Sequence, residues 1–428
     1  MFKISIAMLA MFAAGQQALA QGGACLSLND VMVQAARTSP EVATRKALQR
    51  EAEADVMSAR SLFRPQISTF ARAGTGDVGL VDSTIQSQIG LRVTQRLFDF
   101  GNARFSREAA KASSKASGYE VKVAESRAAL EAASTLLQLL NATRAIEATE
   151  RRREYFQTQL SVVERLLDAG AATLSERAEV AAELAEAEAF EEELRFQKQS
   201  AETRLRIYTD SPAPPCAQDD LVAELTAMTS GLSEIEVAAQ LALDRNPELD
   251  ALSANASSLA ALEKREKRNW LPVVSAVGIS SYASSGNGQD YELQDRIGVD
   301  VTVPLYSGQA LSAERDKAGA QEAAARSRLS AARRQIDEEV RVTFQRILSL
   351  GAQLASRETV EARSLEQFEQ AQLEYDAGTR TLPDLVEARL KYEDAALRRI
   401  AISFDLMLQK LMLLNLTGSG AESLGAVR

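Results

Sequence analysis

The sequence has 428 residues, of which 46% are hydrophobic and only 5% aromatic, and its net charge of −10 disfavours binding to nucleic acid. Histidine is absent, which removes the usual general base, the commonest transition-metal ligand and the Ser-His and Cys-His nucleophile pairs. We therefore expect that the protein is not an enzyme and that it has no catalytic residue, no cofactor and no metal site.

The first predicted element is a secretory signal peptide at residues 1–20. One basic residue, Lys3, precedes an apolar run from Ile4 to Gly15, and the small-residue cleavage site Ala18-Leu19-Ala20 follows. A retained membrane anchor is the alternative, but the run is shorter than the ~20 residues that a spanning helix needs. No stretch of 18 apolar residues occurs further along, so closed β-strands are the remaining way to cross a membrane.

The two cysteines, Cys25 and Cys216, each lie just before a helical segment. A signal peptide directs the chain to an oxidising compartment, where a structural disulfide between them is favoured. Two unpaired thiols are the alternative.

The mature chain consists of one unit written twice, at residues 21–220 and 221–417, with a flexible tail at 418–428. Ser39-Pro40-Glu41-Val42 matches Asn246-Pro247-Glu248-Leu249 at an offset of 207, and Asp168-Ala169-Gly170 matches Asp376-Ala377-Gly378 at an offset of 208. Similarity at a nearly fixed offset indicates a repeated structural unit.

Each unit is predicted to contain an opening helix, a β-hairpin, a long helix and a shorter returning helix. In the first unit these are residues 27–62, strands 67–73 and 85–98, then 101–168 and 173–208; in the second they are 233–269, a hairpin that includes 297–305, then 308–376 and 382–416. A helix of nearly 70 residues is on the order of 100 Å long. An opening helix stacked end to end with a returning helix would match that length.

The predicted strands have one apolar and one polar face. Ile89, Leu91 and Val93 alternate with Arg92 and Thr94, a pattern typical of barrel strands in a bilayer, although a soluble hairpin with one buried face shows it too. Two hairpins per chain cannot close a barrel, so closure would require several chains. The GxGxxG string at residues 74–79 precedes another strand and no helix, so it predicts a loop and no dinucleotide site.

This arrangement resembles the TolC family of outer-membrane factors through both repeats. The run YDAGTRTLPDLVEA, from Tyr375 to Ala388, is similar to the periplasmic hairpin tip of that family. The string Leu97-Phe98-Asp99-Phe100-Gly101 resembles members that serve type I secretion. The resemblance implies a mainly α fold with a small β part. It also implies a homotrimer in which four strands per chain form a shared 12-stranded outer-membrane barrel, continued by a long periplasmic helical barrel.

The same resemblance implies the partners and the function. Outer-membrane lipid would surround the barrel, a periplasmic adaptor would meet the helical tips, and an inner-membrane ABC transporter or proton-driven pump would supply the energy. The expected function is passive conduction of cargo, most specifically type I protein secretion. A drug-efflux duct is the alternative within the family, and a soluble periplasmic coiled-coil scaffold is the alternative from another class.

Site residues follow by position from the family's closed periplasmic end. Gly170 and Gly378 mark the two hairpin tips, and Asp384 and Glu387 would form acidic rings at the aperture. The latch that holds the aperture closed would consist of Arg380 and Tyr375 bonded to Glu176 and Ser175.

A simpler alternative explains part of the second tip. Thr381 is a suitable N-cap, and Pro383 and Asp384 suit the first turn of a helix, so these residues could serve a capped turn with solvated charges.

Overall fold

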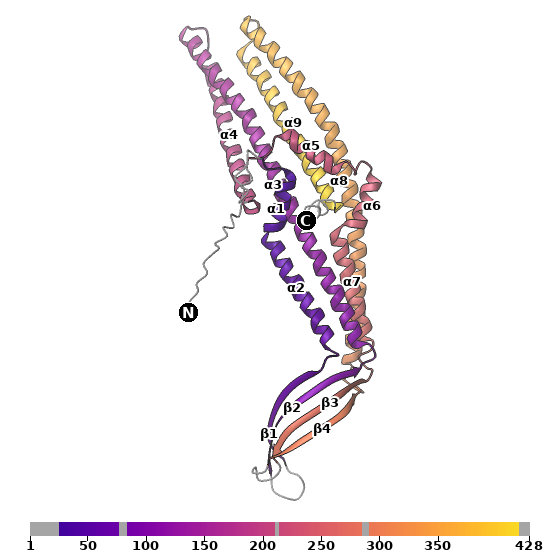
Figure 1. The fold of residues 1–428 in the computed structure, drawn as a ribbon. Helices are drawn as coiled ribbons and strands as arrows, with labels where there is room; N and C mark the ends of the chain where they lie inside the picture. The colour runs from indigo at the N-terminus through magenta and orange to yellow at the C-terminus, as the bar shows by residue number, and fades with distance from the viewer. Residues whose placement is uncertain (1–24, 77–83, 210–213, 285–290, 419–428) are drawn as a thin grey trace, which may run out of the picture.

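The structure is a computed structural model that describes residues 25–76, 84–209, 214–284 and 291–418. The predicted signal peptide, residues 77–79 of the GxGxxG string and residues 419–428 of the predicted tail lie outside these ranges. The chain forms a long rod, with two helical hairpins at one end and a β-sheet at the other (Figure 1).

The element order repeats. The first half contains α1 (Leu28–Thr38), α2 (Pro40–Ser61), β1 (Gln66–Gly76), β2 (Thr84–Phe98), α3 (Asn102–Asp168) and α4 (Leu174–Tyr208). After α5 (Gln218–Thr229), the second half contains α6 (Ile235–Arg245), α7 (Pro247–Glu266), β3 (Val273–Ser284), β4 (Tyr291–Thr302), α8 (Ala310–Asp376) and α9 (Leu382–Leu416). The boundary that the sequence predicts between residues 220 and 221 falls inside α5 and stays a prediction.

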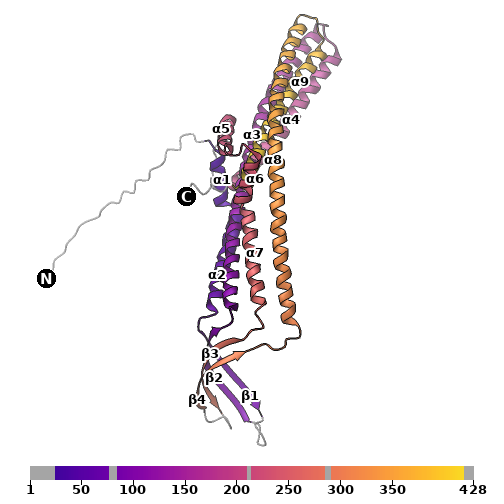
Figure 2. The same ribbon diagram turned by 90° about the vertical axis from the view of Figure 1, so that its right-hand side faces the viewer.

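Two long helices set the length of the rod. Helices α3 and α8 have 67 residues each, which corresponds to about 100 Å. Helix α4 packs against α3, and α9 packs against α8, in the half of each long helix that leads to the tip. Helices α2 and α7 pack against the long helices in the half nearer the sheet (Figure 2). Among the described helices, none is both long enough and apolar enough to cross a membrane.

The short helices meet end to end, as the sequence analysis expected. Thr38 Oγ1, at the end of α1, donates a hydrogen bond of 3.1 Å to Tyr208 O at the end of α4. In the second half, Asn246 Nδ2 donates 3.0 Å to Leu416 O at the end of α9. A stack of shorter helices therefore runs beside each full-length helix.

The prediction of one continuous opening helix per unit is wrong. Each opening helix is broken before a proline, at Ser39-Pro40 and at Asn246-Pro247. Proline lacks an N–H group and forces the preceding residue out of the α region. Ser39 has ψ 126° and Asn246 has ψ 119°, and each proline begins a new helix at a position where its missing N–H costs nothing.

The sheet joins the two halves of the chain. Its strand order is β1-β2-β3-β4, all neighbours are antiparallel, and the central β2–β3 pair connects the two hairpins. Gly90 is needed at this pairing, because a Cβ there would lie 2.6 Å from Ser280 O.

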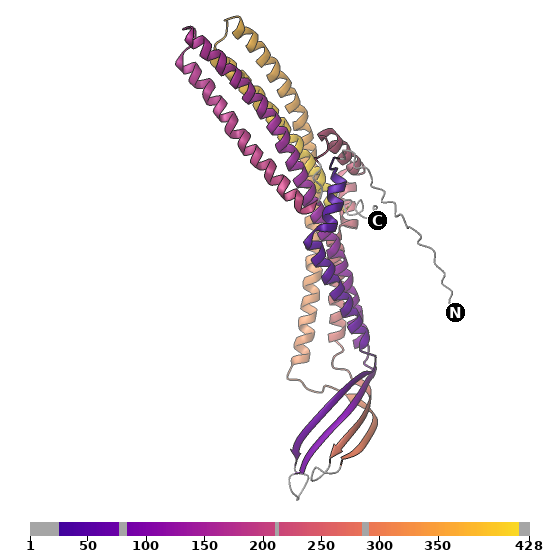
Figure 3. The same cartoon turned by 60° about the vertical axis from the view of Figure 1, so that its left-hand side comes forward.

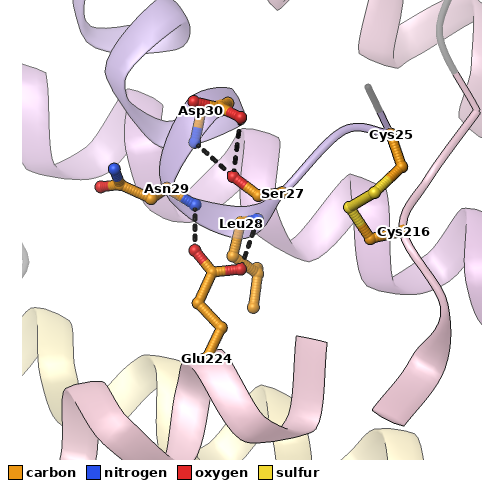
Figure 4. The surroundings of a disulfide bond; sticks show 7 residues. All are labelled: Cys25, Ser27, Leu28, Asn29, Asp30, Cys216 and Glu224. Carbon is orange, nitrogen blue, oxygen red and sulfur yellow. Dashed lines mark hydrogen bonds between the residues drawn. A yellow bond between two sulfur atoms is a disulfide. The ribbon is translucent and has the colours of Figure 1, made fainter. Parts of the chain in front are cut away.

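A disulfide and a capping carboxylate fasten α1 to α5 in the middle of the rod (Figure 4). Cys25 and Cys216 are bonded, and Leu26 N donates 2.8 Å to Pro214 O beside them. The carboxylate of Glu224 accepts hydrogen bonds from Leu28 N at 3.0 Å and Asn29 N at 2.9 Å. It therefore satisfies two of the free N–H groups at the start of α1.

We predict that the Cys25→Ser/Cys216→Ser variant folds but unfolds at a lower temperature than the parent, because the disulfide links residues 191 positions apart. Losing such a link typically costs about 2–4 kcal/mol. Thermal unfolding with and without dithiothreitol measures the effect: the reductant should lower the parent's melting temperature to that of the variant and leave the variant unchanged. A parent that does not respond to a reductant shown to open the bond would contradict the prediction.

Candidate functional site

One face of the sheet is apolar and uncovered. The strand register places Ile89 opposite Tyr282, and Tyr282 opposite Leu293. The apolar side chains of this face that are 40% or more exposed include Ile67, Ile89, Leu91, Val93, Phe98, Tyr282, Leu293, Ile297, Val299 and Val301. Asp295 breaks the pattern. An apolar surface of this extent on a sheet requires a cover of lipid or protein.

The opposite face of the sheet is polar. Arg92 lies opposite Ile279, and Ile279 lies opposite Arg296, so the two arginines share a row across β2, β3 and β4. Gln88 Nε2 donates 2.8 Å to Ser281 Oγ on the same face. The sheet therefore has the two-sided character of a wall between an apolar and an aqueous phase.

The outer edges of the sheet have no partner among the described strands. Strands β1 and β4 each have one neighbour among the described strands. An edge strand presents a row of free N–H and C=O groups that can pair with another strand.

A buried aspartate shapes the turn from β2 into α3. Asp99 is 1% exposed, and its carboxylate accepts hydrogen bonds from Gly101 N at 3.1 Å and Ala103 N at 2.7 Å. Arg96 lies 3.1 Å from the same carboxylate. Phe100 and Gly101 both have positive φ, at 53° and 93°. The string that resembles type I secretion members is therefore, in this chain, a cap for the long helix.

The two hairpin tips have the same backbone design. Gly170 and Gly378 have φ of 73° and 74°, in the left-handed region that favours glycine. The residue after each glycine donates its N–H back to the helix, from Ala171 to Leu166 O at 2.7 Å and from Thr379 to Glu374 O at 2.9 Å. These bonds satisfy carbonyls at the helix ends, and Figure 3 shows the two tips side by side.

The proposed latch residues have other partners in the single chain. Glu176 accepts 2.7 Å from Thr173 N in a capping box at the start of α4. Arg380 lies 3.0 Å from Glu374. Ser175 is exposed. Within the described part of the chain, Arg380 and Glu176 do not form an ion pair, and the latch between the two hairpins stays a prediction.

Tyr375 is the latch residue whose surroundings include the charge of its expected partner, Glu176. It packs half-buried against the apolar core of the tips, whose members include Val180 on α4 and Leu385 on α9. Burial raises the pKa of Tyr375, and the negative charge of Glu176 adds to this effect. The two hairpins therefore bring Tyr375 and Glu176 into electrostatic range.

The two expected aperture residues lie on the exposed side of α9. Leu385 and Val386 are buried, whereas Asp384 and Glu387 are exposed. Asp384 accepts 2.6 Å from Thr381 Oγ1, and Thr381 is the N-cap, as the simpler alternative expected. Glu387 lies 2.6 Å from Lys391, a cation that sequence reasoning missed. The acidic rings stay a prediction, and Lys391 would offset part of their charge.

The structure also shows a buried charge cluster between the two hairpins. Glu393 on α9 lies 2.6 Å from Arg389, which is one turn away, and 3.4 Å from Arg152 on α3. Arg152 in turn lies 2.7 Å from Glu183 on α4. The guanidinium of Arg389 also lies 4.5 Å from the ring centroid of Tyr155 on α3. The cluster thus connects three helices from both hairpins.

The environment of this cluster changes the titration of its members. Burial raises the pKa of Tyr155 to about 12, even though the charge of Arg389 opposes the effect. Burial also raises the pKa of Glu393, and Arg389 and Arg152 act in the opposite direction. An ion pair removed from water in this way is sensitive to the loss of either partner.

Comparison with known proteins identifies a family. The family model described as outer membrane efflux protein matches residues 31–209 and 238–419. The chain is 23% identical over 388 residues to outer membrane protein TolC of Salmonella enteritidis, covering 86% of this chain and 77% of that protein. It is 23% identical over 422 residues to outer membrane efflux protein BepC of Brucella suis biovar 1 (strain 1330), covering 96% and 88%.

Solved structures show the same fold. The CmeC outer membrane channel of Campylobacter jejuni matches with a TM-score of 0.77 and 18% identity, covering 92% of this chain and 86% of that chain. The predicted fold class, mainly helical with a small sheet and similar to TolC, is confirmed.

We predict that Arg389→Met destabilises the protein by about 3 kcal/mol, because Glu393 loses its nearest cation in a buried setting. Without Arg389 the pKa of Glu393 rises further, so the folded variant binds the proton more tightly than the unfolded chain does. Its stability therefore falls as pH rises, and the loss should be smaller at about pH 5 than at about pH 8. Melting curves at the two pH values measure this difference.

The matched control is Arg363→Met, which removes an exposed arginine 2.7 Å from Glu366 and should change stability little. The double variant Arg389→Met/Glu393→Met should recover most of the loss. If Arg389→Met and Arg363→Met behave alike, the buried cluster does not stabilise the hairpins.

Proposed function

The chain belongs to the outer membrane efflux protein family and is a TolC-like outer-membrane channel subunit, and from this premise we propose that three copies assemble into one continuous export duct. The four strands of each copy contribute to a shared 12-stranded barrel, and the helical hairpins continue it into the periplasm. The duct performs no bond chemistry and conducts cargo passively.

One observation carries the proposal: a sheet with an uncovered apolar face also has two unpaired edges. Lipid can cover the apolar face, but lipid offers no hydrogen bonds to the edges. Strands β1 and β4 lie at opposite edges, so β4 of one copy can pair with β1 of the next in a head-to-tail ring. Such a ring leaves no edge unpaired.

The partners follow from a channel without a motor. An inner-membrane ABC transporter or proton-driven pump supplies the energy, and a periplasmic adaptor meets the tips around Gly170 and Gly378. We propose type I protein secretion as the specific use, supported by the resemblance of residues 97–101. The capping role of Asp99 weakens that support, so a small-molecule efflux duct is the second candidate, supported by the efflux description of BepC.

The proposed assembly can be tested on the purified protein. We expect it to sediment with outer membranes, to require detergent for extraction, to have the mass of a trimer and to conduct ions in a planar bilayer. A monomer extracted without detergent would instead indicate a periplasmic coiled-coil scaffold. In cells, gene deletion should abolish secretion of a large protein if the channel serves type I secretion, and should only increase drug sensitivity if it serves efflux.

The latch predicts a gain of conductance. Glu176→Gln removes the charge that Arg380 of a neighbouring hairpin would bind, while glutamine can keep the capping box at Thr173. Arg380→Gln removes the other partner. Both variants should conduct better than the parent in a planar bilayer, because an exposed pair is worth only about 0.2–1 kcal/mol and merely biases the gate.

A third variant tests the competition within one chain. Glu374→Gln frees Arg380 from its present partner and should strengthen the latch, so conductance should fall. The latch would be dropped, and the channel proposal kept, if all three variants conduct like the parent.

A further inference from the structure

We propose that the polar face of the sheet carries an arginine belt that binds multivalent anions in the outer-membrane part of the duct. The belt, defined as Arg92 and Arg296 of each copy, rests on the proposed barrel, because only there does the polar face become a lumen wall. Anionic groups of the cargo, whether carboxylate or phosphate, are the expected ligands.

The strand register places the two arginines in one row of the sheet. Ser68, Arg92, Ile279 and Arg296 lie in one row across the four strands. Neighbouring strands are about 4.8 Å apart, so the backbones of Arg92 and Arg296 are roughly 10 Å apart. Three copies would place six guanidinium groups around the lumen, as one ring of three Arg92 side chains and one ring of three Arg296 side chains, offset along the barrel axis by the strand tilt.

Neither arginine is neutralised by a neighbour. Within the described residues, no carboxylate lies within ion-pair distance of Arg92 or Arg296, whereas Arg96 on the same strand pairs with Asp99. Glu292 and Asp300 share a strand and a face with Arg296, but each is four residues away along the strand, which is roughly 13 Å.

Assembly would not supply a counter-charge from the adjoining strand. Arg92 lies on an inner strand of the sheet, and Arg296 lies on the edge strand β4. The strand that would pair with β4 is β1 of the next copy, whose sequence QISTFARAGTG contains no acidic residue. Arg72 on β1 is not part of the belt, because Glu292 on β4 of the neighbouring copy could form an ion pair with it.

An aromatic ring holds one member of the belt against the wall. Phe70 is half-buried and lies opposite Gly90, which places it on the polar face. The guanidinium of Arg92 lies 5.6 Å from the centroid of this ring, and that of Arg72 lies 5.1 Å from it. These contacts favour a guanidinium held at the wall and open to the lumen. Phe70 is thus a positioning residue.

The belt gives the duct opposite charges at its two ends. The expected aperture residues Asp384 and Glu387 are acidic, whereas the barrel level of Arg92 and Arg296 is basic. In a wide lumen, the field of a charged wall extends about 10 Å at 0.1 M salt. The belt therefore concentrates multivalent anions near the wall at low salt and loses this effect at high salt.

Titration calorimetry on the purified trimer tests the proposal with hexaglutamate as the anion and hexalysine as the opposite-charge probe. The parent should bind hexaglutamate at about 50 mM salt, and Arg92→Gln/Arg296→Gln should weaken this binding roughly tenfold. Arg92→Lys/Arg296→Lys keeps the charge and should retain most of the binding. The matched control Arg104→Gln/Arg363→Gln removes two exposed helix arginines and should bind like the parent.

Planar-bilayer conductance and trimer mass are measured on every variant. If the glutamine variant forms a conducting trimer and still binds hexaglutamate like the parent, or if the parent does not bind it at all, the belt is overturned and the channel stands. If the parent forms no trimer and conducts no ions, the proposed function itself fails.

Discussion

The structure depends on one constraint: every backbone N–H and C=O group in a bilayer needs a hydrogen-bond partner. Four strands satisfy each other in the interior of the sheet, but β1 and β4 leave their outer edges open. The described strands of a single chain do not meet the constraint by themselves, which is why we propose an assembly as the working unit. The helical part must then follow the same symmetry, because each strand pair leads directly into a long helix.

A few specific contacts connect the two hairpins of the helical part. The cluster of Arg152, Glu183, Arg389 and Glu393 connects α3, α4 and α9 through ion pairs that water hardly reaches. Such pairs are stable only in a narrow geometry. This cluster therefore holds the two hairpins in one relative position, whereas the exposed charges at the tips can exchange partners at little cost.

The sequence predicted the elements best where residues close together in the chain determine the local structure. Period-two alternation located β2, and the glycines at residues 170 and 378 located both tips to within a residue or two. The breaks at Ser39 and Asn246 were missed, although proline at the first helical position was a usable signal. The pairing of Glu393 with Arg152 could not be predicted, because it joins positions far apart in the chain whose proximity depends on how two hairpins pack. The pairing of Arg380 with Glu374, in place of the expected Glu176, was also missed.

The disulfide between Cys25 and Cys216 has a consequence for the covalent integrity of the chain. The bond closes a loop that contains helices α1 to α4 and strands β1 and β2, and so both the first β-hairpin and the first helical hairpin. Proteolytic cleavage at one position inside this loop leaves both fragments attached to each other. The rest of the chain, from α5 onward, lies outside this loop. A single cut there therefore separates the chain into two pieces.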